Sequence, residues 1–107
     1  MQPLSIIIAI AAATAIAANS AAAQRGDPEI ARSLAATCAG CHGTDGVSQG
    51  VIESLAGMRK DEIILKMQAF KTGARPATVM HQLARGYTDP QVELIADWYA
   101  AQPAPRK

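Results

Sequence analysis

Both cysteines of the chain lie in one short run, Cys38-Ala39-Gly40-Cys41-His42. This C-x-x-C-H spacing is the attachment pattern of c-type haem. On a helical turn, side chains three residues apart project to the same side, so each sulfur can form a thioether with one vinyl group of a porphyrin edge. The histidine that follows is then held under the ring, where an imidazole nitrogen can reach the iron. We therefore predict one covalently bound haem c, attached through Cys38 and Cys41, with His42 as an axial iron ligand.

Three other kinds of site can use cysteines at this spacing. A zinc site would need Cys38, Cys41, His42 and His81, but the adjacent pair Cys41 and His42 can hardly close tetrahedrally on one ion. A thioredoxin-like redox pair belongs in a βαβ context, which this sequence does not predict. A disulfide between Cys38 and Cys41 is compatible with export, but it leaves unexplained how so small a chain completes its core. Haem attachment is the favoured interpretation.

The second axial ligand is expected to be a methionine, because a thioether suits low-spin haem iron and raises its potential when it is paired with histidine. Met80 is the first candidate, since its segment is irregular and can wrap to the opposite face of the ring. Met67 lies on an apolar stripe at helical spacing, which favours a role in the core. Met58 and His81 remain as alternatives, although His81 is expected to be a surface neighbour.

The imidazole of His42 has a second nitrogen whose N–H needs an acceptor, because that bond fixes the tautomer and the basicity of the ring. Residues 43–57, between the first two expected helices, are rich in glycine, serine and other small residues. We expect the carbonyl of Ser54, just before the Leu-Ala-Gly run at residues 55–57, to accept this hydrogen bond.

Three helices are expected to position these residues. The first has Asp27 as its N-cap and Pro28 in its first turn, and it is expected to carry the cysteines on its last turn. The second spans residues 60–72, with acidic residues at its start and Gly73 as its terminator. Its apolar residues gather on one face, so it needs a packing partner.

The third helix is the best delimited, because residues 88–91 read Thr-Asp-Pro-Gln, which fits a capping box with proline in the first turn. Pro103 is expected to end it. A short helical turn is expected at residues 78–85. No alternating run is long enough for a strand, so the sequence predicts an all-α fold.

Residues 1–23 differ in composition from the remainder, because they are dominated by Leu, Ile and Ala and contain no charged side chain. The apolar run is followed by Ala21-Ala22-Ala23, which offers a small-x-small cleavage site before Gln24. We therefore expect residues 1–23 to be a signal peptide and residues 24–107 to be the mature domain, exported to the periplasm. Such a compartment permits disulfides and covalent haem.

The composition excludes several classes of function. The chain has 107 residues, ten Lys and Arg against nine Asp and Glu, and a formal net charge of +1. This length allows one small domain, with no room for separate cofactor and substrate domains. Without a basic run, the sequence lacks the electrostatic footprint of nucleic-acid binding.

These features together resemble the class I cytochromes c: a helix that leads into C-x-x-C-H, a glycine-rich loop, a Leu-Ala-Gly turn, a methionine loop and an amphipathic last helix. Residues 69–73 and 78–88 read AFKTG and TVMHQLARGYT. They are similar to the cytochrome c4 group and, more closely, to the cytochrome subunits of flavocytochrome c sulfide dehydrogenases. In those subunits the methionine that matches Met80 ligates the iron. The chain departs from the two-haem members in its single motif, and it has Ser54 where many class I relatives have proline.

The resemblance implies a periplasmic monohaem electron-transfer protein with no active site of its own. It implies a flavoprotein partner that carries FAD and oxidises sulfide, and a downstream electron acceptor. A free-standing diffusible carrier is the main alternative. A haem-based ligand sensor or peroxidase would need a weak or absent Met80 bond, because a haem with both axial positions filled favours electron transfer. A non-haem disulfide or metal-binding module is the third alternative.

Overall fold

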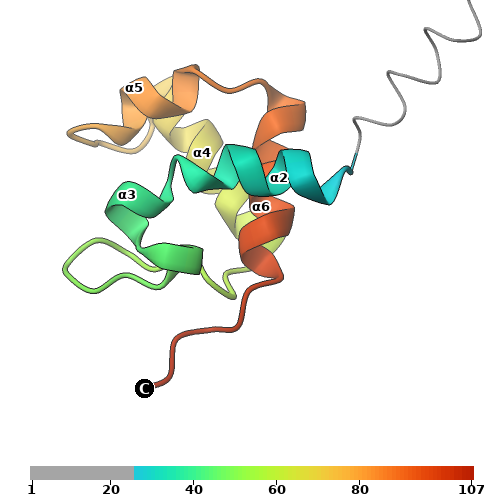
Figure 1. Cartoon of the computed structure of the whole chain (residues 1–107). Helices are drawn as coiled ribbons and strands as arrows, with labels where there is room; N and C mark the ends of the chain where they lie inside the picture. The colour runs from blue at the N-terminus through green and yellow to red at the C-terminus, as the bar shows by residue number, and fades with distance from the viewer. Residues whose placement is uncertain (1–25) are drawn as a thin grey trace, which may run out of the picture.

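The computed structural model describes residues 26–107, and within that range the chain is helical without any strand (Figure 1). This confirms the predicted all-α class. The expected signal peptide, residues 1–23, lies outside the described residues. The elements are α2 (Pro28–Ala36), α3 (Ala39–His42), the 3₁₀ turn η1 (Thr44–Gly46), α4 (Lys60–Thr72), α5 (Met80–Arg85) and α6 (Asp89–Ala100). Among residues 26–107, no helix combines the length and the apolar character needed to cross a membrane.

The helix ends follow the local signals in the sequence. Asp27 caps α2, since its carboxylate accepts a hydrogen bond from the backbone N–H of Glu29 at 2.9 Å. Thr88 and Gln91 form the predicted capping box at the start of α6: each side chain accepts from the backbone N–H of the other, at 3.3 and 2.9 Å. Gly73 ends α4 in the left-handed conformation, with φ of 80°.

The first helix differs from its prediction, because α2 ends at Ala36 and the cysteines follow it. The hydroxyl of Thr37 donates to the carbonyl of Leu34 at 2.9 Å, and the backbone N–H of Cys38 donates to the carbonyl of Ala35 at 3.0 Å. These bonds span three residues and not four, so the chain tightens here and starts a separate short helix, α3. The prediction that the first helix carries the cysteines on its last turn is therefore wrong.

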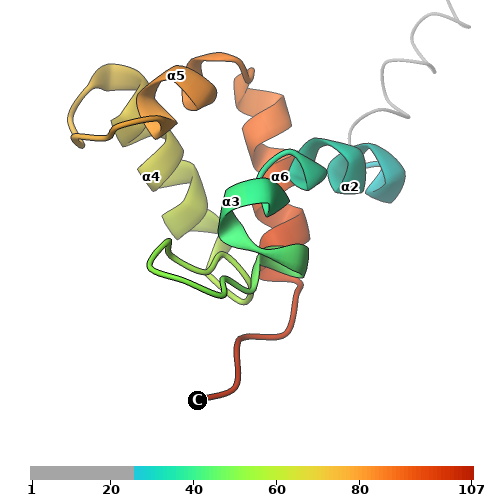
Figure 2. The same cartoon turned by 60° about the vertical axis from the view of Figure 1, so that its left-hand side comes forward.

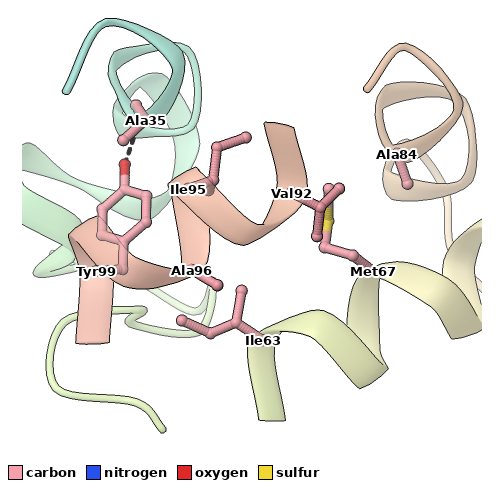
Figure 3. Packing of buried hydrophobic residues seen from close by; sticks show 8 residues of the cluster. All are labelled: Ala35, Ile63, Met67, Ala84, Val92, Ile95, Ala96 and Tyr99. Carbon is pink, nitrogen blue, oxygen red and sulfur yellow. Dashed lines mark hydrogen bonds between the residues drawn. The ribbon is translucent and has the colours of Figure 1, made fainter. Parts of the chain in front are cut away.

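The core lies where α6 packs against α2 on one side and α4 on the other, while α5 packs on α4 (Figures 1 and 2). Its side chains are small for the most part, and no polar or charged residue is buried in the described part of the chain. Figure 3 shows the cluster of buried residues: Ala35, Ile63, Met67, Ala84, Val92, Ile95, Ala96 and Tyr99.

Tyr99 ties α6 to α2 and to the loop after η1. Its ring is only 1% exposed, and its hydroxyl donates to the carbonyl of Ala35 at 2.5 Å (Figure 3). Burial raises the pKa of Tyr99, so the hydroxyl stays protonated and remains a donor. Gly46 passes against the same ring with φ of 79°, and a Cβ there would lie 2.6 Å from the ring. Only glycine suits this position, which holds the start of the loop against α6.

Candidate functional site

The two cysteines lie on one turn of chain at the edge of the core. Both are free thiols. Cys38 is half-buried and packs against the core cluster, whereas Cys41 is exposed. Burial raises the pKa of the Cys38 thiol, although hydrogen bonds with Thr37 and Tyr99 lower it in part. The backbone N–H of both Cys41 and His42 points back to the Cys38 carbonyl, at 3.3 and 2.9 Å, so the motif is held as a helical turn.

The ring of His42 is fixed by a backbone carbonyl of the following loop. Its Nδ1 lies 2.5 Å from the carbonyl oxygen of Glu53. The prediction that the carbonyl of Ser54, one residue later, accepts this bond is therefore wrong. The hydroxyl of Ser54 instead accepts from the backbone N–H of Ser48 at 2.9 Å, which closes the loop on itself.

This hydrogen bond indicates the tautomer of the neutral His42 ring. A neutral imidazole carries one N–H donor and one lone pair, and a carbonyl can only accept, so the proton lies on Nδ1 of His42. The lone pair is therefore on Nε2. That tautomer is the one in which Nε2 can bind a metal while the other nitrogen is held by an outer partner.

The methionines after the motif lie in three different environments. Met67 is 7% exposed and belongs to the buried cluster, which confirms its predicted role in the core. Met58 and Met80 are half-buried and pack against that cluster from outside. Met80 is the first residue of α5, so the helix begins at this residue and two positions later than expected. His81 is half-buried and its Nδ1 is buried with no hydrogen-bond partner among the described residues, so it is more enclosed than the expected surface neighbour.

The described side chains around the motif fit a haem. Cys38, just before α3, and Met80, the first residue of α5, both border the same apolar core although they lie far apart in the sequence. In Figure 1, α5 lies above α3 on the same side of the molecule, with α4 behind them. Val79 and Leu83 flank Met80 and are 53% and 49% exposed, so apolar surface on α5 is left without cover. An apolar macrocycle held through the thiols would give these side chains a packing partner.

The described residues give no support to the zinc alternative. Within residues 26–107, no three His, Cys, Asp or Glu side chains come together as a group that could hold a metal ion. Haem iron is suited by one imidazole and one thioether, which differ from the cysteine and histidine ligands that a zinc site would need.

Several known proteins are similar to this chain in sequence, although no protein-family model matches it. The cytochrome subunit of sulfide dehydrogenase from Chlorobaculum tepidum is 46% identical over 66 residues, which are 62% of this chain and 60% of that protein. Cytochrome c-553 from Nitratidesulfovibrio vulgaris is 30% identical over 103 residues, 92% of this chain and 96% of that protein. The thiosulfate dehydrogenase electron acceptor of Thiomonas intermedia is 37% identical over 70 residues, 62% of this chain and 32% of that protein.

The likeness to cytochrome c-553 extends over almost the whole length of both proteins. The helical fold without strands in residues 26–107 is the architecture expected of that family. The C-x-x-C-H run, with His42 held by a carbonyl, supplies the family's defining chemistry at the expected place. The chain belongs to the class I c-type cytochromes, which carry haem c and transfer electrons.

Proposed function

We propose that this chain is a periplasmic monohaem cytochrome whose haem c is bound by Cys38 and Cys41 through thioethers. His42 and Met80 are its axial ligands. The observation that carries this proposal is the bond from His42 Nδ1 to the Glu53 carbonyl, because it leaves Nε2 free to face a metal beside two free thiols. Residues 1–23 are the signal peptide that directs export, and residues 24–107 form the mature cytochrome domain.

With both axial positions filled, the haem supplies a one-electron redox change at iron and no open coordination site. The work of the chain is then to hold the haem in apolar surroundings and to set its potential. The described core suits this task, since it contains no buried polar or charged residue. Electron transfer is therefore favoured over the binding of oxygen or peroxide.

We propose that the electrons come from an FAD-containing flavoprotein that oxidises sulfide. The partner's FAD would supply two-electron oxidation of sulfide to zero-valent sulfur, and Cys38, Cys41, His42 and Met80 would hold the haem that takes these electrons from the reduced flavin one at a time for a downstream acceptor. Two relatives support this class of partner, because their names are the cytochrome subunit of sulfide dehydrogenase and the electron acceptor of thiosulfate dehydrogenase. The matched region spans less than two thirds of each of these two proteins.

The charges of α4 favour a lasting interface over electrostatic capture. Each lysine of this helix is paired with a carboxylate: Lys60 with Asp97 at 3.0 Å, Lys66 with Glu53 at 2.5 Å and with Glu62 at 3.2 Å, and Lys71 with Asp89 at 3.4 Å. A transient carrier that is steered to its partner needs a strong patch of one sign. Paired charges supply no such patch here, whereas durable subunit interfaces are more apolar.

Exposed apolar side chains are available for such an interface. Val51 is fully exposed, Ile52 is 43% exposed, and Leu65 on α4 is 62% exposed. Val51 and Ile52 lie in the loop whose next residue supplies the carbonyl for His42. A partner seated on this loop would therefore approach the haem side of the molecule.

The proposed complex is tested by purification from the native organism. We expect the haem chain to copurify with an FAD-containing chain through a wash in 1 M salt, an ionic strength at which the screening length is only about 3 Å. Sulfide should then reduce the haem rapidly in the complex, and removal of the flavoprotein should abolish this reduction. A haem protein that elutes alone at low salt, and that sulfide reduces no faster when the flavoprotein is added, would contradict the partner.

That outcome would instead support a free-standing diffusible carrier. This second candidate is favoured by one observation, the match to cytochrome c-553 over 92% of this chain. Its haem site would be the same, and only the partner would differ.

A further inference from the structure

Glu53 joins the motif histidine to helix α4 through two different groups. Its backbone carbonyl accepts from His42 Nδ1 at 2.5 Å, and its carboxylate lies 2.5 Å from Nζ of Lys66. The backbone and side chain of one residue thus link α3 to α4. In the fold these two helices otherwise pack mainly on different neighbours, α3 on η1 and α2, and α4 on α5 and α6.

Lys66 is a firm anchor for this link. It lies between Ile63 and Met67, which are 4% and 7% exposed and fix this turn of α4 in the core. A second carboxylate, Glu62 one turn earlier on the same helix, lies 3.2 Å from the same ammonium. The hydrogen bond with Glu53 raises the pKa of Lys66, so the ammonium stays charged at neutral pH.

The loop gives Glu53 little other support. Its two preceding residues, Val51 and Ile52, are exposed. The described loop bonds nearby hold the residues after it: the hydroxyl of Ser54 accepts from Ser48, and the N–H groups of residues 55 and 56 donate to the carbonyl of Gly46 at 2.8 and 3.1 Å. The contact with Lys66 is therefore the tie that acts on Glu53 itself.

We propose that Lys66 is a positioning residue for the axial histidine, acting through Glu53. This inference rests on the proposed ligation of iron by His42. An outer acceptor that holds the other N–H of a ligating histidine fixes the ring and raises its basicity. A more basic imidazole stabilises the oxidised iron. Loss of the Lys66 tie lets the Glu53 carbonyl move, which weakens the bond to Nδ1 and favours the reduced state.

Removing Lys66 has two effects that shift the reduction potential in opposite directions, so the direction of the measured shift distinguishes them. Removing a positive charge by itself favours the oxidised iron, because less positive charge faces the metal. Loosening the histidine favours the reduced iron. Lys60→Met is the matched control, since Lys60 lies on the same helix and loses an ion pair with Asp97 that has no link to His42.

The experiment compares the intact haem protein with its Lys66→Met, Lys60→Met and Lys66→Arg variants. NMR of the reduced protein follows the exchange of the His42 Nδ1 proton with solvent. In Lys66→Met this exchange should be about threefold to fivefold faster, which is the effect expected from the loss of exposed ion pairs. The reduction equilibrium should shift about twofold toward the reduced iron, or about 20 mV upward. Lys60→Met should leave the proton exchange unchanged and should not raise the potential. Lys66→Arg, which keeps the charge and the reach to Glu53, should behave as the wild type.

Equal proton exchange in Lys66→Met and Lys60→Met would overturn the positioning role and leave the proposed function intact. A downward shift of the potential in Lys66→Met, with unchanged exchange, would show a charge effect only and would also overturn it. A wild-type protein without a histidine-ligated covalent haem would overturn both proposals. Failure of sulfide to reduce the haem through a flavoprotein would overturn the proposed partner alone.

Discussion

Replacing Met80 with alanine is expected to lower the reduction potential by on the order of 100 mV or more, within the range of about 0.8 V that axial ligands span. The thioether stabilises reduced iron, so its loss favours the oxidised state. The sulfur-to-iron band in the near-infrared spectrum should vanish, and carbon monoxide should bind to the reduced protein. Potentiometry and absorption spectroscopy with carbon monoxide check these effects.

Met58→Ala is the matched control for this experiment, because Met58 is also half-buried and packs against the same core cluster as Met80. The control variant should keep the near-infrared band and exclude carbon monoxide. If Met58→Ala opens the iron and Met80→Ala does not, the assignment of the sixth ligand is wrong.

Replacing both cysteines, in Cys38→Ala with Cys41→Ala, is expected to abolish covalent haem attachment and to leave the chain largely unfolded. Five of the ten buried core residues in the described part of the chain are alanines, and its largest fully buried side chains are Tyr99 and Ile95. Domains of this size are marginal without a bound group that completes the core. A loss of roughly 5 kcal/mol equals the whole stability of a weakly stable domain, which is enough to unfold the chain.

Circular dichroism and thermal unfolding measure this loss. The Met80→Ala variant is the control, since it keeps both thioethers and should remain folded with its haem. A double-cysteine variant with the helix content and unfolding temperature of the wild type would show that the haem is no part of the core.

Features that depend on neighbouring residues were predictable from the sequence. The N-cap at Asp27, the capping box of Thr88 and Gln91, and the left-handed end at Gly73 are local signals, and the structure has all three. The same holds for the core position of Met67, which follows from its place on a helical stripe.

Features that depend on distant contacts were not predictable. The break before Cys38 is stabilised by Thr37, whose hydroxyl bonds with the hydroxyl of Tyr87, 50 residues away, at 2.5 Å. The acceptor of His42 lies at Glu53 and not at Ser54, because loop closure and the ion pair with Lys66 decide which carbonyl faces the ring. Nothing in the local sequence of Glu53 indicates that its partner lies 13 residues away on helix α4.

The position of Met80 in the fold also could not be predicted from its neighbours in the sequence. Its type and its irregular segment favour a role as a ligand, but its place beside the core cluster, which Cys38 also borders, depends on packing between segments far apart in the sequence. The sequence therefore predicts the local helix signals better than it predicts how the chain arranges the proposed haem-binding residues.

The intact mass of the mature protein tests the central claim most directly. The protein is purified from whole cells, so that exported and unexported chains are both collected, and it is extracted with acidified acetone, which removes haem that is not covalently bound. We expect one species, a chain that begins at Gln24 and is heavier than its sequence by the mass of one haem, with the added mass located on the peptide that contains Cys38 and Cys41. A chain that retains Met1 and has the mass of the polypeptide alone would contradict both export and haem attachment.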